Sequence, residues 1–242
     1  MPPPLAVTFD FWNTLVAEDD GALRDARIER VGGILAGAGV PMDRRELEAV
    51  FERSWQGFVR AWHENRQYTA QDAVDHVVAE TGAQVAPAVR DELVDAVLHA
   101  GRGAATRLTP NAGPCLRALK DAGVRLWIIC DVGLTPSPVL RSYLDGHGVL
   151  GLFDHWSFSD EVGVFKPDPA IFAHAASGLG VDDPSAFAHV GDLRRTDVGG
   201  STAAGWTTVR YRGLNDDIDE SSPDAAIVVD HHGELLAALG LA

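Results

Sequence analysis

The sequence has few cysteines, an excess of acidic over basic residues, and no long apolar run. Two cysteines, Cys115 and Cys130, provide neither a disulfide framework nor a metal cluster, which favours a reducing cytoplasm. Lys and Arg number 20 against 35 Asp and Glu, so a basic surface for nucleic acid is not expected. No apolar run approaches the roughly 18 residues that cross a bilayer, and the N-terminus lacks the pattern of a signal peptide. We therefore expect a cytoplasmic protein that binds neither nucleic acid nor membrane; the sequence specifies no oligomeric state.

Short apolar runs alternate with helical patterns along most of the chain. The runs cover residues 5–11, 124–130, 186–190, 207–209 and 225–229. The helical patterns cover residues 113–122, 136–146, 169–179, 196–204 and 234–239. This alternation is typical of βαβ units with helices on both faces of a parallel sheet. The sequence therefore predicts an α/β fold, a Rossmann-like doubly wound parallel sheet.

Residues 21–103 break this alternation. They contain no convincing strand, and their apolar residues recur at helical spacing. We expect four helices that form an inserted helical-bundle cap domain, with residues 1–20 and 104–242 forming the Rossmann-like core domain. An insertion after the first strand of an open sheet lies over the carboxyl ends of the strands, where such folds bind ligands. The insertion is therefore predicted to be a lid.

One part of this insertion is rich in aromatic and charged side chains. Four aromatic residues follow helical spacing and are expected in the core of the cap: Phe51, Trp55, Phe58 and Trp62. Three polar neighbours are either solvated surface or contacts to a substrate: Arg60, His63 and Glu64.

Charged residues stand where the predicted strands end. Asp10 closes the first apolar run, and Asp192 and Asp197 follow the run that ends at Val190. Lys166 precedes a proline between these segments. Because the ends of parallel strands meet at one edge of a sheet, the three carboxylates and the ammonium group are expected to converge. Oxygen ligands of this kind suit Mg²⁺.

These residues resemble the four motifs of the haloacid dehalogenase-like (HAD) hydrolase superfamily, and the resemblance covers nearly the whole chain. The first motif lies at residues 10–15, DFWNTL, and the second falls on Cys130. The third falls on Lys166, and the fourth on Gly191-Asp192 and Asp197. The helical insertion resembles the family's cap, which lies between the first and second motifs.

The resemblance implies an Mg²⁺-dependent phosphatase that acts on a small phosphorylated metabolite through an aspartyl-phosphate. Asp10 would be the nucleophile, and Lys166 would keep it ionised and neutralise charge on the phosphoryl group. Contacts to the substrate would come from Trp12, Thr14, Cys130 and Asp131. The ligands of Mg²⁺ would be Asp10, the Trp12 carbonyl, Asp192 and Asp197.

Two positions depart from the phosphatase pattern. Phosphatases of the family that this chain resembles generally carry a second aspartate two residues after the nucleophile, as general acid and base, where this sequence has Trp12. Dehalogenases of the family have a bulky aromatic there, so a 2-haloacid dehalogenase-type hydrolase is one alternative. A catalytically impaired relative that only binds its ligand is another. Cys130 replaces the usual Ser or Thr of the second motif, and a thiol is a weaker donor than a hydroxyl.

Overall fold

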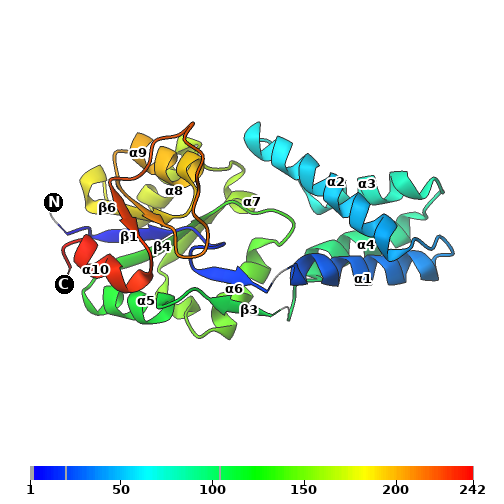
Figure 1. Ribbon diagram of the computed structural model, residues 1–242, viewed down its shortest axis with the longest axis horizontal. Helices are drawn as coiled ribbons and strands as arrows, with labels where there is room; N and C mark the ends of the chain where they lie inside the picture. The colour runs from blue at the N-terminus through cyan, green and yellow to red at the C-terminus, as the bar shows by residue number, and fades with distance from the viewer. Residues whose placement is uncertain (1–2, 20, 104, 242) are drawn as a thin grey trace. The chain divides into compact units, whose positions relative to one another are not determined.

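The core of the protein is one parallel sheet (Figure 1). The computed structural model describes residues 3–19, 21–103 and 105–241. Six strands pair in the order β5-β4-β1-β6-β7-β8. Their bounds are β1 Ala6–Phe9, β4 Arg125–Cys130, β5 His155–Phe158, β6 Phe187–Gly191, β7 Thr207–Tyr211 and β8 Ile227–Val229. Each neighbouring pair is parallel, which confirms the predicted α/β fold.

Continuous burial explains why the central strands were visible in the sequence. All residues of β1 and β6 are buried, as are five of the six in β4, and such strands appear as unbroken apolar runs. Strand β5 was not predicted, because it begins with the exposed His155 and the half-buried Trp156 at the edge of the sheet.

Helices cover both faces of the sheet, α8 and α9 on one and α5 and α10 on the other (Figure 1). The cluster between α8 and the sheet includes Ile171 and Phe172 from the helix and Trp127 and Phe187 from the strands. The helices that follow the insertion are α5 Ala112–Asp121, α6 Ser137–Gly146, α7 Ser159–Val162, α8 Pro169–Leu179, α9 Gly199–Ala203 and α10 Leu235–Ala238. The predicted helix at 196–204 is a π-helical turn, Arg194–Val198, followed by α9.

Shorter elements complete the chain. Strands β2 (Val16–Glu18) and β3 (Thr106–Leu108) form a separate two-stranded sheet. Three 3₁₀ turns lie at Leu150–Leu152, Pro184–Ala186 and His232–Glu234.

The insertion consists of four helices, as predicted. They are α1 Ala22–Gly37, α2 Arg44–His63, α3 Ala70–Thr81 and α4 Pro87–His99. Capping boxes begin two of them: Asp43 with Glu46 starts α2, and Thr69 with Asp72 starts α3. Such reciprocal bonds satisfy backbone groups that have no partner within the helix. Gly82, at φ 62°, ends α3 in the left-handed conformation that glycine adopts without strain.

The aromatic residues of α2 divide between core and surface. Phe51 and Phe58 are buried, and the ring of Phe58 also contacts those of Trp55 and Tyr68. Trp55, however, is 52% exposed, so its prediction as a core residue was wrong. The buried stripe of a helix spans only part of its circumference, and Trp55 lies at its border.

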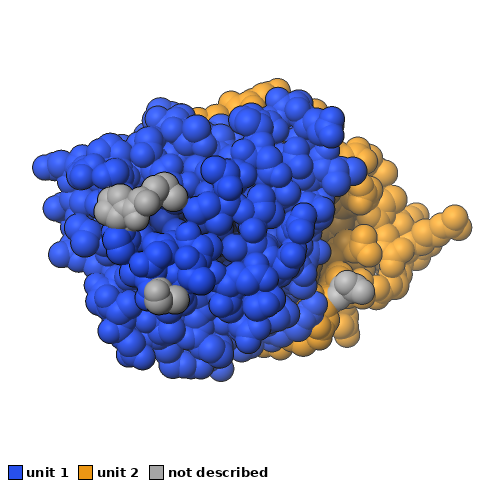
Figure 2. Space-filling view, turned by 60° about the vertical axis from the view of Figure 1, so that its left-hand side comes forward, with its two compact units in different colours: residues 1–17, 106–131, 143–242 blue, residues 18–105, 132–142 orange. Residues whose placement is uncertain are grey.

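The chain divides into two compact units (Figure 2). Unit 1 comprises residues 1–17, 106–131 and 143–242, and unit 2 comprises residues 18–105 and 132–142. The predicted domain boundaries at 20 and 104 stay a prediction, as does the lid position of the insertion. Within the described residues, every helix is too short or too polar to cross a lipid bilayer.

Candidate active site

The topology of the sheet brings the first and fourth motifs together. Phe9 of β1 is in register with Val190 of β6, and the Asp10 N–H donates to the Val190 carbonyl at 2.8 Å. Asp10 and Asp192 therefore follow neighbouring parallel strands at the same edge. Both residues are buried.

Lys166 joins the carboxylates. Its Nζ donates to Asp10 Oδ1 at 2.5 Å, to Asp197 Oδ1 at 2.6 Å and to the Ile129 carbonyl at 3.1 Å. Its backbone N–H donates to Asp131 Oδ1 at 2.8 Å. The Lys166 side chain is 2% exposed, and these four bonds hold it from both ends. The convergence expected from the sequence is present in the structure.

Asp197 lies at the end of β6 because the chain turns tightly there. A Cβ atom at Gly191 would collide with the Asp197 carboxyl group, so only glycine allows this approach. Asp197 Oδ1 also accepts from His189 Nε2 at 3.0 Å, and Oδ2 accepts from the Leu193 N–H at 3.0 Å. Thr8 Oγ1 contacts the other ring nitrogen of His189 at 2.7 Å. Both oxygens of Asp197 are thus bound by protein donors.

The cluster places three buried carboxyl groups around one ammonium group. Burial raises the pKa of Asp10 well above its usual value, and repulsion from Asp197 and Asp192 adds to this although Lys166 opposes it. Burial, again with repulsion from Asp197, raises the pKa of Asp192 to about 7. Burial also disfavours ionised Asp197, but Lys166 and His189 hold its pKa below the usual value. The crowding of three carboxyl groups around one ammonium group therefore favours the protonated forms of Asp10 and Asp192 unless a further cation binds.

The donor set fits a hard divalent cation. One carboxylate oxygen from each of Asp10, Asp192 and Asp197 lies within 4.8 Å of the others. Carboxylates are ligands that Mg²⁺ accepts, and a dication would favour the ionised forms of Asp10 and Asp192. Asp10, Asp192 and Asp197 thus form a candidate metal site.

The residues predicted to contact the substrate differ in burial and in hydrogen bonding. Thr14 Oγ1 is buried and forms no hydrogen bond within the described part of the chain. The Cys130 thiol is buried at the end of β4, donates to the Asp131 carbonyl at 3.4 Å, and has its pKa raised by burial. Trp12 is half-buried, with its ring edge-on to Phe11. Their roles toward a substrate stay predictions.

Two residues that were not predicted fix the loop of the first motif. The Thr14 carbonyl accepts from Thr109 Oγ1 at 2.6 Å and contacts His232 Nε2 at 2.7 Å. The His232 ring stacks on Tyr211, and burial lowers its pKa to about 4. A neutral ring can donate from Nε2, so His232 holds the backbone beside Thr14 without adding charge.

Another residue that was not predicted contacts a carboxylate of the candidate metal site directly. Asn215 Nδ2 donates to Asp192 Oδ2 at 2.8 Å. Asn215 lies in the polar loop after β7, and nothing in its sequence pattern indicated such a role.

Comparison of the sequence with known protein families points to the same family as the motifs. Residues 4–205 match the haloacid dehalogenase-like hydrolases. The chain belongs to this hydrolase family. The roles expected of Asp10, Lys166 and Asp192 from the family motifs stay predictions.

Relatives of this HAD hydrolase include phosphatases and dehalogenases. A glyceraldehyde 3-phosphate phosphatase of Methanopyrus kandleri is 30% identical over 236 residues, 96% of this chain and 95% of that protein. The (S)-2-haloacid dehalogenase 1 of Pseudomonas sp. (strain CBS-3) is 27% identical over 216 residues, 89% of this chain and 87% of that protein. The HAD hydrolase YfnB of Bacillus subtilis, in a structure bound to magnesium, has a TM-score of 0.69, 16% identity and coverage of 98% and 99%. At that identity the likeness concerns the fold.

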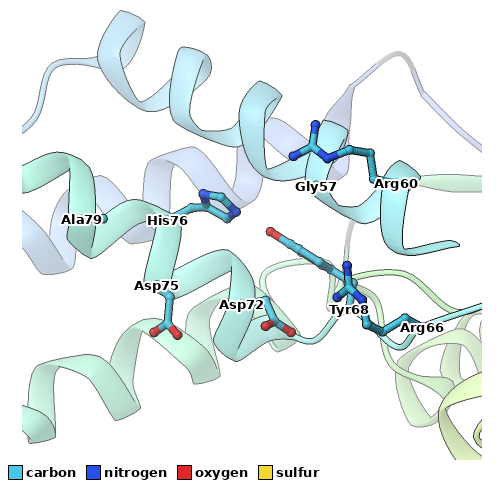
Figure 3. Close-up of a pocket in the computed structure, with 8 residues that line it drawn as sticks. All are labelled: Gly57, Arg60, Arg66, Tyr68, Asp72, Asp75, His76 and Ala79. Carbon is cyan, nitrogen blue, oxygen red and sulfur yellow. The ribbon is translucent and has the colours of Figure 1, made fainter. Parts of the chain in front are cut away.

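The helical unit of this HAD hydrolase contains a groove of its own (Figure 3). It has a volume of about 410 Å³ and is lined by Gly57, Arg60, Arg66, Tyr68, Asp72, Asp75, His76 and Ala79. The rings of Tyr68 and His76 stack beside it. Of the three polar cap residues singled out in the sequence, Arg60 lines this groove.

Proposed function

We propose that this HAD hydrolase is an Mg²⁺-dependent phosphatase that acts on a small phosphorylated metabolite. The observation that carries the proposal is the charge of the cluster, with three buried carboxylates against one ammonium group. A site of this kind needs a cation before a phosphate dianion can approach it. The M. kandleri phosphatase, which matches over nearly its whole length, supports a phosphorylated substrate.

Asp10 and Asp192 are the carboxylates best placed to hold Mg²⁺. Asp10 accepts one side-chain bond, from Lys166, and Asp192 accepts one from Asn215. Asp197 has both oxygens bound by protein donors, so we assign it mainly to holding Lys166. The Trp12 carbonyl would be a third protein ligand. When bound, the ion would supply the positive charge that lets the phosphate approach an ionised Asp10.

Asp10 would then act as the nucleophile. One of its carboxylate oxygens would attack phosphorus, and the bond between phosphorus and the substrate oxygen would break. This gives an aspartyl-phosphate and an alkoxide, which takes its proton from water. Water would hydrolyse this intermediate, releasing inorganic phosphate and regenerating Asp10. Lys166 donates to Asp10 at 2.5 Å, so its charge would remain beside the reacting oxygens throughout.

The first test is a panel of phosphorylated metabolites assayed with Mg²⁺. We expect phosphate release from at least one compound, loss of that activity in EDTA, and recovery on adding excess Mg²⁺. A parallel panel of 2-haloacids, assayed for halide, provides the comparison. Halide release that persists in EDTA, without any phosphate release, would contradict the phosphatase proposal.

Trp12 should affect which phosphate esters react. An indole does not transfer protons near neutrality, so an alkoxide leaves without the general-acid help that is typically worth about 10²–10⁴-fold. We expect a steep dependence of rate on leaving-group pKa in the wild type, with acyl and aryl phosphates preferred. The dependence should become flatter in Trp12→Asp. It should stay steep in Trp12→Asn, because asparagine has the shape of aspartate but no acidic proton. Equal slopes in all three proteins would show that position 12 does not limit proton transfer.

Trp12 also supports a second candidate function, 2-haloacid dehalogenation. Halide departs without a proton, so an aromatic residue at this position would cost such a reaction nothing. The Pseudomonas dehalogenase matches most of the chain. Against it stand the three carboxyl groups of the cluster, whose ionised forms would repel the carboxylate of a haloacid.

A further inference from the structure

The loop that follows β7 is tied firmly to the core. Arg210 of β7, which is 2% exposed, binds Asp216 at 2.6 Å and Asp224 through two bonds of 2.6 and 2.9 Å. The Arg194 N–H donates to Asp217 Oδ2 at 2.7 Å. Paired arginine–carboxylate bonds of this geometry hold a loop in one position. The loop is therefore anchored at Asp216, Asp217 and Asp224, which follow Asn215, by contacts that do not involve Asn215 itself.

From this anchored loop, Asn215 reaches the candidate metal site. Its amide Nδ2 donates to Asp192 Oδ2 at 2.8 Å. Asn215 itself is only half-buried, so its side chain contributes little to the apolar core. An amide is a neutral donor: it fixes the orientation of the carboxylate but leaves its negative charge uncompensated. The Asp197 carboxylate, in contrast, forms an ion pair with the charged Lys166.

We propose that Asn215 is a positioning residue for divalent-cation binding, which it serves by orienting the Asp192 carboxylate. This inference rests on the proposed metal site of Asp10 and Asp192. A carboxylate that is free to rotate must lose that freedom when it binds a cation, whereas one already held by a hydrogen bond has lost it beforehand. Removing the amide should therefore weaken binding of the ion without unfolding the protein.

The experiment measures the affinity of the metal-stripped full chain for Mn²⁺, by electron paramagnetic resonance of the free ion. The variant is Asn215→Ala, and the matched control is Leu214→Ala, at a neighbouring side chain that is 41% exposed. We expect the dissociation constant to rise by about 10–100-fold in Asn215→Ala, the usual effect of losing an outer-shell partner. It should stay within about twofold of the wild type in Leu214→Ala. Melting temperatures of the metal-free proteins should agree, because the arginine contacts of the loop remain.

A second measurement separates positioning from a structural role. If a phosphate substrate is found, Asn215→Ala should need more Mg²⁺ for half-maximal activity but reach nearly the wild-type kcat at saturating Mg²⁺. Equal Mn²⁺ affinity in wild type and Asn215→Ala would overturn the inference and leave the metal site intact. An equal loss in both variants would assign the effect to the loop as a whole and would also overturn it. Absence of Mn²⁺ binding by the wild type would instead refute the proposed metal site.

Discussion

Replacing Asp10 with asparagine should lower turnover by roughly 10⁴-fold or more while leaving the protein folded. The amide nitrogen and oxygen of asparagine do not form the aspartyl-phosphate, so the chemical step is lost. The fold should be at least as stable as the wild type, because the amide oxygen still accepts from Lys166 and one buried charge is removed. Activity with the identified substrate and a denaturant titration measure the two effects.

Asp121→Asn is a suitable control, since Asp121 is exposed at the end of α5. It should change neither activity nor stability. If Asp10→Asn kept activity within about tenfold of the wild type, the covalent mechanism would be refuted. A trapped phosphoryl group, found by mass spectrometry on Asp10 of the wild type and absent from the variant, would be direct support.

The second large effect concerns Lys166. In Lys166→Met the buried carboxylates of Asp10 and Asp197 lose their shared ammonium partner, and removing one member of a buried ion pair typically costs about 3–5 kcal/mol. We expect a decrease of that size in the free energy of unfolding, together with loss of activity. Mg²⁺ should stabilise the variant, because it supplies positive charge to the same carboxylates.

The other lysine of the chain provides the control. Lys120 pairs with Asp154 at 2.8 Å, but its side chain is 31% exposed, so Lys120→Met should cost only about 0–1 kcal/mol. Urea titrations of both variants, with and without Mg²⁺, give the comparison. Equal stability of the two would contradict the charge argument. If Lys166→Met does not fold, Lys166→Arg keeps the charge and tests the activity alone.

The sequence predicted the parts of the site that lie at the ends of buried strands. A carboxylate such as Asp10 at the end of an apolar run is costly to bury without a partner, so it stands out. His189, in the middle of β6, did not stand out in this way. A histidine can be buried in its neutral form without this cost, so in the sequence it resembles an ordinary core residue. Its bond to Asp197 depends on which side of the strand it faces, and that became visible only in the structure.

Asn215 was not predictable for a different reason. It is a polar residue in a polar loop, where asparagine is ordinary, and its partner Asp192 lies 23 positions earlier. The contact depends on the path that Arg210 imposes on the loop. Local pattern also failed for β5 and for Trp55, since the edge of a sheet and the border of a helix stripe are decided by packing.

The burial of Lys166 has a consequence for chemical labelling of the protein. Acylating reagents such as activated esters need an amine that is both accessible and deprotonated. Lys166 is neither, because it is 2% exposed and its neighbours Asp10 and Asp197 raise its pKa against the opposing effect of burial. Lys120 is the only other lysine in the sequence. A fluorophore ester should therefore attach at Lys120 and at the amino terminus, and should leave Lys166 unmodified.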